Sequence, residues 1–393
     1  MTDERCEAVP TNCPPPVRRI PTDPAVDAPA DGIALCLSGG GYRATLFHLG
    51  ALWRLSELGY LPLLERVSSV SGGSITAAAL GSAWHLLDFD AQGRSRAFGR
   101  EVVTPVRALC SRTVDVPAIV FGVLFGWLGG GWPADHVVRS YRRHLLGNAT
   151  LQDLPDRPRF VINATNLGSG VLWRFSKPYM RDWRVGEIAR PRTRLATAVA
   201  ASSAFPPLLS PLRLRFSPSA FVPDTGQDLQ VAPYTTRVAL TDGGVYDNLG
   251  LETAWKKHRT ILVSDAGGRQ ADDPSPAGDW AGQSIRVVGL LSQGVTSLRK
   301  KQAIAAFISK ERAGTYWGIR SEIDNYHVHA ALPCPPERAL ELALTPTRLK
   351  ALDSERQERL INWGYAICDA AMRAHVDPSL PAPPGFPYPH AGI

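Results

Sequence analysis

The chain has 393 residues, of which 44% are hydrophobic, so it is long enough for one large α/β domain or for two smaller domains. Its formal net charge of +7 suits an anionic surface or an anionic substrate. No basic run alternates with aromatic residues and no nucleic-acid-binding motif is present, which argues against a nucleic-acid partner. The six cysteines lack C-x-x-C spacing, so neither a zinc site nor a disulfide framework is predicted.

The first 30 residues are expected to form a flexible Pro-rich leader, because they show no hydrophobic period. Residues 33–37 (Ile-Ala-Leu-Cys-Leu) then predict a short buried strand of the kind found in parallel sheets. The strand runs directly into Ser38-Gly39-Gly40-Gly41-Tyr42-Arg43. A helix is predicted over 44–58, where large apolar residues recur on one side and Gly59 follows.

A second β-branched run, over 66–70, ends abruptly in Ser71-Gly72-Gly73, and a small-residue helix is predicted over 75–80. A serine at such a strand-to-helix corner is held in a tight turn with its hydroxyl at the mouth of the sheet. The dipole and free N–H groups of the following helix favour negative charge beside it. We therefore treat Ser71 as a candidate nucleophile. The order of strand, glycine turn, helix and strand predicts right-handed βαβ units and a mostly parallel sheet flanked by helices.

Residues 116–132 carry no charge and contain several glycines and Pro117. Three interpretations stay open for this segment: a buried core helix, an apolar lid over a lipid site, and a membrane-inserted segment at the lower limit of spanning length. Farther along the chain we expect strands at 159–166, 171–175, 237–241 and 260–265, helices at 193–204, 249–257, 292–312 and 353–374, and a Pro-rich tail at 376–393. The helix at 292–312 is expected to be basic and amphipathic.

Three groups of residues follow predicted strands: the glycines 39–41 with Arg43, then Ser71, and then Asp242. We expect them to converge, because strand ends in an open α/β sheet share one edge. Consecutive glycines expose backbone N–H groups, so Gly39, Gly40 and Gly41 can stabilise an oxyanion or, alternatively, cradle a phosphate. Arg43 can bind a substrate phosphate, or it can be an ordinary surface arginine. Asp242, before Gly243 and Gly244, can act as a base or orient one, or it can be a turn aspartate.

Asp247 and Asn248 are interpreted as a structural pair that caps the next helix. Histidine is the usual partner of a catalytic serine, but none of the nine histidines lies in an obvious late-chain loop. His327 and His329 are the best candidates, on a segment that reads as a strand. A metal site built on them is not favoured.

The glycine run with Arg43, the serine turn Ser69-x-Ser71-x-Gly73, the sequence Ala204-Phe205-Pro206-Pro207 and Asp242-Gly243-Gly244 occur in this order. This ordered set resembles the patatin-like phospholipase family and the related cytosolic phospholipase A group, over about residues 31–270. The resemblance implies a patatin-like three-layer sandwich, with a catalytic domain over 31–375 whose part from 271 to 375 is a C-terminal elaboration. The family usually has glycine at the position of Ser69, so Ser69 and Ser74 are kept as less favoured nucleophiles.

The resemblance also implies a Ser71–Asp242 dyad in place of a triad, an oxyanion hole at Gly39–Gly41, and Arg43 near a substrate phosphate or the oxyanion. The expected activity is hydrolysis of acyl esters in lipids, of phospholipase A or lysophospholipase type, without a metal or other cofactor. Two alternatives stay open: a hydrolase of small soluble esters and a non-catalytic lipid-binding module. No secretory signal peptide is predicted, so the expected location is cytoplasmic, with possible peripheral contact at an anionic membrane, and export by another route is left open.

Overall fold

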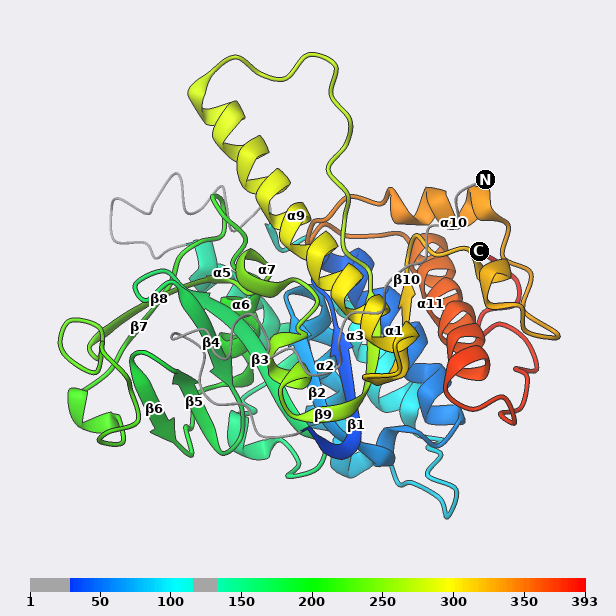
Figure 1. Ribbon diagram of the computed structural model, residues 1–393, viewed down its shortest axis with the longest axis horizontal. Helices are drawn as coiled ribbons and strands as arrows, with labels where there is room; N and C mark the ends of the chain where they lie inside the picture. The colour runs from blue at the N-terminus through cyan, green and yellow to red at the C-terminus, as the bar shows by residue number, and fades with distance from the viewer. Residues whose placement is uncertain (1–28, 116–132) are drawn as a thin grey trace, which may run out of the picture.

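The computed structural model describes residues 29–115 and 133–393, so the predicted leader and the uncharged segment 116–132 lie outside the described residues. Within those ranges, ten strands form a single sheet (Figure 1). The strands are β1 (Ala30–Leu37), β2 (Leu64–Val70), β3 (Arg159–Asn166), β4 (Val171–Phe175), β5 (Tyr179–Asp182), β6 (Gly186–Ala189), β7 (Leu212–Arg215), β8 (Arg237–Asp242), β9 (His258–Asp265) and β10 (Ala313–Gly318).

One half of this sheet is parallel, in the order β10-β9-β1-β2-β3. β1 lies at its centre, where Leu35 is in register with Val67 of β2 and with Leu262 of β9. Because neighbouring side chains of a strand point to opposite faces, Leu35 and Leu37 enter one hydrophobic core and Ala34 and Cys36 enter another. The apolar run at 33–37 therefore fits a strand covered on both faces, as predicted.

The other half of the sheet is antiparallel, with β4, β5 and β6 following β3 in sequence. β8 also pairs with β3 in the antiparallel sense, and β7 pairs with β8. The expectation that Asp242 follows a strand at the shared carboxyl edge of parallel strands is therefore wrong for β8. Because β8 runs opposite to β3, its last residue, Asp242, is paired with Ala164 of β3. The residue before Ala164, Asn163, is paired with Val70 at the end of β2, so Asp242 lies close to the Ser71 turn.

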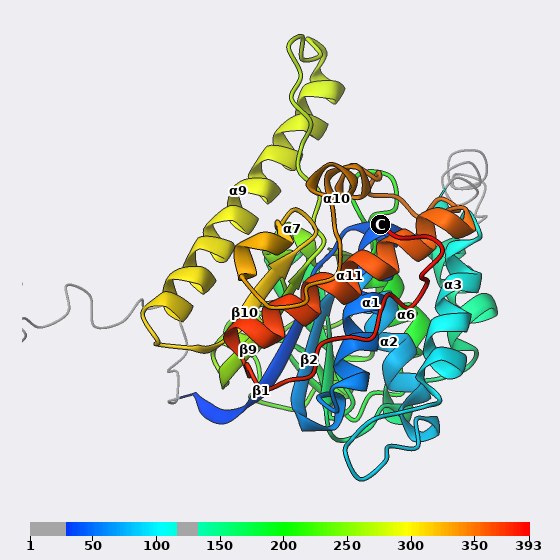
Figure 2. The same ribbon diagram turned by 90° about the vertical axis from the view of Figure 1, so that its right-hand side faces the viewer.

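Helices cover both faces of the sheet, which gives the three layers visible in Figure 2. The larger core receives side chains from α1, α2, α3, α5, α6, α10 and α11, whereas the smaller core receives them from α8 and the end of α9. The helices are α1 (Gly41–Glu57), α2 (Gly72–Ala83), α3 (Thr104–Cys110), α5 (Pro133–Tyr141), α6 (Leu195–Ser202), α7 (Gly244–Asp247), α8 (Glu252–Trp255), α9 (Trp280–Ile308), α10 (Pro336–Ala343) and α11 (Ser354–His375).

Three local predictions differ from the structure. The helix predicted at 249–257 is shortened to α8, because Gly250 adopts a positive φ of 68° before it, and the short helix α7 precedes that glycine. The helix predicted at 292–312 begins earlier, at Trp280. His327 and His329 do not lie on a strand, since His327 is left-handed after a short 3₁₀ turn.

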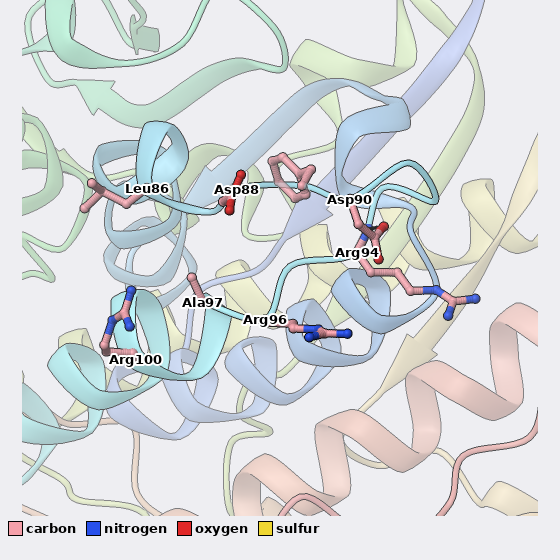
Figure 3. Close-up of a pocket in the computed structure, with 8 residues that line it drawn as sticks. Leu86, Asp88, Asp90, Arg94, Arg96, Ala97 and Arg100 are labelled. Atoms are coloured by element: carbon pink, nitrogen blue, oxygen red, sulfur yellow. Dashed lines mark hydrogen bonds between the residues drawn. The ribbon is translucent and has the colours of Figure 1, made fainter.

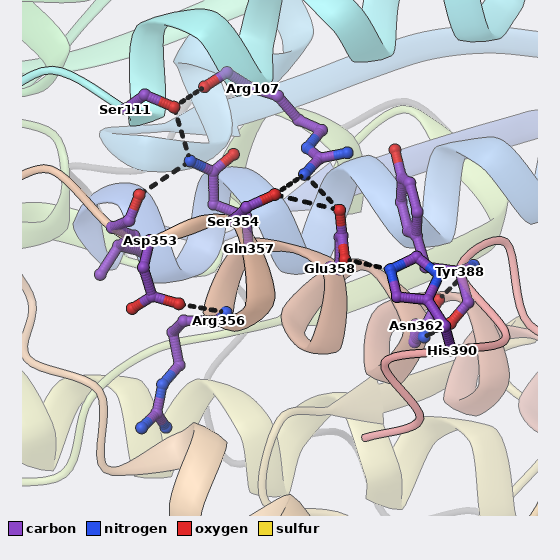
Figure 4. Close-up of polar contacts among 11 residues, drawn as sticks. Arg107, Ser111, Asp353, Ser354, Arg356, Gln357, Glu358, Asn362, Tyr388 and His390 are labelled. Carbon is purple, nitrogen blue, oxygen red and sulfur yellow. Dashed lines mark hydrogen bonds and ion pairs between the residues drawn. The ribbon is translucent and has the colours of Figure 1, made fainter.

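The C-terminal segment 376–393 packs against α11 (Figure 4). The buried amide of Asn362 donates to the carbonyl oxygens of Tyr388 and Gly392, at 2.8 and 2.7 Å, and accepts from Tyr388 N–H at 3.0 Å. His390 lies 2.9 Å from Glu358, which also receives a hydrogen bond from Arg107. The segment predicted only as a tail thus satisfies buried polar groups of the last helix.

Candidate active site

Ser71 occupies a sharp turn between the end of β2 and the start of α2. Its φ of 50° and ψ of −119° are uncommon for a residue with a side chain, so the turn is strained. Two hydrogen bonds stabilise the turn. Ser71 N–H donates to Ser202 Oγ at 2.9 Å, and Ser202 Oγ donates to the carbonyl oxygen of Asn163 at 2.6 Å. This arrangement presents the Ser71 hydroxyl at the N-terminus of α2.

The glycine loop lies directly against Ser71. A Cβ added at Gly39 would be 3.1 Å from Ser71 Cβ, and one added at Gly72 would be 2.2 Å from the carbonyl oxygen of Gly41. Thr45 joins the same two segments, because its hydroxyl lies 3.1 Å from the Gly41 oxygen and 2.9 Å from the Gly72 oxygen. Side chains at these glycines would push the loop away from the serine.

The three glycines of the loop differ in the state of their N–H groups. Gly39 N–H donates to the carbonyl oxygen of Asn248 at 3.1 Å. Within the described part of the chain, the N–H groups of Gly40 and Gly41 have no hydrogen-bond acceptor. Gly40 (φ 153°) and Gly41 (φ 61°) both have backbone conformations that favour glycine. Two adjacent backbone donors are therefore free beside Ser71.

Asp242 reaches the same place from β8. Gly243 brings its turn against the end of β2, since a Cβ added there would be 3.2 Å from Val70 Cγ1. Asp242 Oδ1 accepts from Gly244 N–H at 2.7 Å, whereas no full hydrogen bond reaches Oδ2 from the described residues. Asp242 as a whole is 2% exposed. Burial raises the pKa of Asp242 to about 6, and the Gly244 N–H and the Ser71 hydroxyl partly oppose that shift.

The Ser71 hydroxyl is thus near enough to the Asp242 carboxylate to stabilise its charge, although the pair lacks the geometry of a full hydrogen bond. Long or poorly aligned contacts of this kind are common in enzymes without substrate. The structure brings Ser71, Gly40, Gly41 and Asp242 to one point. A nucleophile, a proton acceptor and oxyanion donors are the three parts that acyl transfer requires.

Arg43 lies at this site but points into the protein. The residue is 2% exposed, and its guanidinium donates to the carbonyl oxygen of Ala266 from Nε at 3.2 Å and from Nη2 at 3.0 Å. It also donates to the Thr345 oxygen at 2.5 Å and to Thr347 Oγ1 at 2.8 Å. Burial lowers the pKa of Arg43 to about 10. These contacts favour a role in holding the loops around Gly40 over direct contact with a substrate phosphate.

The alternative nucleophiles Ser69 and Ser74 are fully buried. Ser74 Oγ donates to Ser69 Oγ at 3.0 Å and lies 2.9 Å from Ser202 Oγ. Ser69 Oγ lies 3.4 Å from the carbonyl oxygen of Val161. Their hydroxyl groups form a network beneath the Ser71 turn, and Ser71 itself is half-buried. The serine at position 69 is accommodated by these hydrogen bonds.

Asp247 caps α8, as its interpretation as a structural residue predicts, because its carboxylate accepts from the N–H groups of Leu249 and Glu252. Asn248 lies closer to the chemistry than that interpretation implies. Its carbonyl oxygen holds Gly39, and its Oδ1 lies 2.4 Å and 2.6 Å from the positions that a Cβ at Gly39 and at Gly244 would take. The sequence signal that could have indicated this position is its closeness to Asp242, which it follows by six residues.

His48 also lies beside the candidate site, and it was not singled out from the sequence. It is fully buried beneath the glycine loop, with Nδ1 2.8 Å from Ser264 Oγ and Nε2 2.9 Å from the carbonyl oxygen of Ser38. Because a carbonyl only accepts, Nε2 carries the proton and Nδ1 accepts from Ser264. Burial lowers the pKa of His48 to about 4, so the ring is neutral at physiological pH. Nothing in the pattern of the helix distinguishes it from a core residue.

A pocket of about 420 Å³ lies elsewhere and is lined by none of the site residues. Arg94, Arg96 and Arg100 surround it together with Asp88 and Asp90 (Figure 3). Across the described residues, no group of three or more His, Cys, Asp or Glu side chains is placed to hold a metal ion. The same residues contain no helix with both the length and the apolar composition needed to cross a bilayer.

The model of the patatin-like phospholipase family matches residues 35–255, which include Ser71, the glycine loop and Asp242. No curated protein matches the chain. Among solved structures, human GIVD cytosolic phospholipase A2 superposes with a TM-score of 0.50 at 14% identity, covering 86% of this chain and 60% of that chain. Its complex with methyl gamma-linolenyl fluorophosphonate superposes with a TM-score of 0.49 at 15% identity, covering 86% and 57%.

VipD from Legionella pneumophila gives a lower TM-score of 0.35 at 15% identity, covering 89% of this chain and 68% of that chain. The likeness to the human phospholipase concerns the fold, in which helices flank a central sheet of parallel and antiparallel strands. This chain spans about three fifths of the length of the human phospholipase.

Proposed function

Because the chain belongs to the patatin-like phospholipase family, we propose that it is a serine lipid acyl hydrolase of phospholipase A or lysophospholipase type. The observation that carries this proposal is the meeting of three groups at one point. These are the strained Ser71, the free N–H groups of Gly40 and Gly41, and the buried Asp242 carboxyl with its raised pKa. Each group supplies a different requirement of ester cleavage.

In the proposed reaction, Asp242 accepts the proton of the Ser71 hydroxyl while Ser71 Oγ forms a bond to the ester carbonyl carbon. The carbonyl oxygen becomes an oxyanion and is stabilised by Gly40 and Gly41 N–H. The tetrahedral intermediate then expels the alcohol, which takes the proton from Asp242. In the second half, Asp242 activates a water molecule that hydrolyses the acyl-serine ester. The reaction needs no cofactor.

The proposed oxyanion hole contains two of the three glycines expected from the sequence. Gly39 N–H is occupied by the Asn248 carbonyl, so we assign Gly39 to shaping the loop and the two following glycines to the oxyanion hole. Asn248 and Arg43 act as positioning residues, because their contacts hold this loop in place. Peripheral contact with an anionic membrane is part of the proposal, since the substrates of such an enzyme lie in lipid surfaces.

The test is labelling with a serine-directed fluorophosphonate, followed by mass mapping of the modified peptide. We expect the probe on Ser71 in the unaltered protein and strongly reduced labelling in Asp242→Asn, because the hydroxyl then lacks its proton acceptor. Ser71→Ala is the control for labelling at other sites, and thermal melting of each variant shows that it is folded.

Labelling of a different serine would move the active site. No labelling of folded protein, together with retention of intact lipid, would replace the hydrolase by a non-catalytic lipid-binding module. Turnover of soluble short-chain esters but not of lipid in vesicles would favour the small-ester hydrolase.

A further inference from the structure

Helix α9 projects from the body of the molecule above the sheet (Figures 1 and 2). Its C-terminal part is packed, with Ala303 and Ala306 buried. Toward its N-terminus the helix extends past its neighbours, and large apolar side chains remain exposed there. Exposed apolar surface of this extent marks an interaction site in a monomeric protein.

The exposed apolar side chains on α9 form a stripe. At 100° per residue, positions separated by 7, 11 and 18 residues share one face of a helix. Trp280, Val287, Leu291 and Leu298 have these separations and are 84%, 51%, 66% and 69% exposed. We call these four residues the outer stripe; Val288 and Val295 extend it on one side. It is about 27 Å long, from the rise of 1.5 Å per residue.

A different face of α9, about 100° to 120° around the helix from the outer stripe, is fixed to the protein beside the candidate active site. Ser292 Oγ donates to the carbonyl oxygen of Gly244 at 3.2 Å, two residues after Asp242. Arg299 donates to Glu252 of α8 at 2.8 Å. The outer stripe is therefore left exposed while its helix contacts the turn that carries Asp242.

The charges of α9 all have one sign. The helix contains four basic residues and no Asp or Glu over its 29 positions. Arg286 faces Asp273 at 3.6 Å and Arg299 is paired with Glu252, whereas the ammonium group of Lys300 lies 4.5 Å from the Tyr316 ring centroid and Lys301 is exposed. A helix with an apolar face, flanking basic residues and a terminal tryptophan is typical of helices that lie in the plane of a membrane interface.

We propose that the outer stripe of α9 docks on an anionic phospholipid surface and so brings the Ser71 site to its substrate, an inference that rests on the proposed function. The stripe is a projecting ridge, which a fluid lipid surface can envelop, and the ammonium groups of Lys300 and Lys301, next to Leu298 in the sequence, are complementary to anionic headgroups. The helix lies in the interface and does not cross the bilayer, in agreement with its hydropathy.

The experiment is flotation with vesicles of phosphatidylcholine containing a minority of phosphatidylglycerol, using the full chain in a Ser71→Ala background so that no lipid is consumed. We expect binding, and we expect Leu291→Gln combined with Leu298→Gln to weaken it about tenfold or more, because two large apolar side chains no longer enter the lipid. The matched control is Leu63→Gln with Leu86→Gln, which alters two other exposed leucines, 56% and 46% exposed, outside α9. This control should bind as the parent does.

Two further measurements keep the inference separate from the catalytic proposal. In chains with Ser71 intact, the α9 variant should keep its activity on a soluble ester and lose activity on vesicles. Vesicles without phosphatidylglycerol should bind more weakly. Equal binding by the α9 variant and its parent would overturn the inference. So would a dimer in solution that the α9 substitutions dissociate, since a second copy would then cover the stripe. Loss of esterase activity with normal vesicle binding would count against the proposed function alone.

Discussion

At the scale of single residues, Asp242 has a buried carboxyl group, and its proposed role as a base requires the charged form of that group. Burial raises its pKa to about 6, because desolvation disfavours the charged carboxylate. The same shift places the pKa of a base near the pH at which it operates, which is favourable for general base catalysis. The residue therefore has separate, measurable effects on activity and on stability.

The first effect is on the pH dependence of hydrolysis. Asp242 must be deprotonated to accept the Ser71 proton, so kcat/KM for a soluble ester should fall as pH decreases through about 6 and level off above it. The measurement is a pH series of initial rates, with circular dichroism at each pH to confirm folding. A kcat/KM that is constant between about pH 5 and pH 8 would contradict the assignment of Asp242 as the base.

The second effect is on folding. The folded-state pKa lies above the ordinary value of 3.8, so this group lowers stability as pH rises from about 4 to 6, and the loss is complete at pH 7. The difference corresponds to roughly 3 kcal/mol. Asp242→Asn keeps an oxygen for Gly244 N–H without the charge. We expect it to abolish hydrolysis and to raise the free energy of unfolding at pH 7 by up to that amount.

Urea unfolding of Asp242→Asn and of the unaltered chain, compared at pH 7 and at pH 4, measures this contribution. The gain should shrink at the lower pH, where the native carboxyl is protonated. A variant that is less stable than the parent at both pH values would contradict the assignment of desolvation as the dominant cause.

At the scale of elements, the crossing of α1 and α11 depends on two glycines. A Cβ added at Gly50 would lie 1.9 Å from the carbonyl oxygen of Ile361, and one added at Gly364 would lie 1.8 Å from that of Phe47. These approaches are between backbones, so no side chain can move aside. α1 begins at the glycine loop, and the crossing therefore also fixes the base of the candidate oxyanion hole.

Helix propensity and packing make opposite predictions for Gly364→Ala. Alanine favours a helix over glycine by about 1 kcal/mol, but the clash with Phe47 requires the two helices to separate. We expect packing to dominate and stability to fall by about 3 kcal/mol or more. Gly294→Ala in α9 is the matched control, because nothing lies within 4 Å of its added Cβ, and it should be neutral or stabilising by up to about 1 kcal/mol. Similar changes in melting temperature for both would refute the tight crossing.

At the scale of the whole molecule, the fold is completed by residues beyond the family match at 35–255. β9 lies beside β1 at the centre of the parallel half, and α11 packs on α1. The segment 376–393 then packs on α11 through Asn362 and Glu358 (Figure 4). The C-terminal part is therefore structural support for the site.

Ending the chain after Val376 should destabilise it by about 3 kcal/mol or more, because the buried Asn362 amide loses three hydrogen bonds at once. His390→Ala is the control that removes only the contact with Glu358. Its side chain is 72% exposed, so the expected loss is below about 1 kcal/mol. Chemical denaturation of both variants gives the comparison, and equal stability of the truncated and unaltered chains would contradict this role.

The sequence by itself determined the strand–turn–helix units around Ser71 and the glycine loop, because short apolar runs and adjacent glycines constrain the backbone locally. It also placed Asp242 at the end of a strand. Only the tertiary structure decided that β8 runs antiparallel, that Gly39 N–H and the Arg43 guanidinium are occupied, and that the stripe on α9 is left uncovered. These features depend on contacts between residues distant in the chain, which a local pattern does not encode.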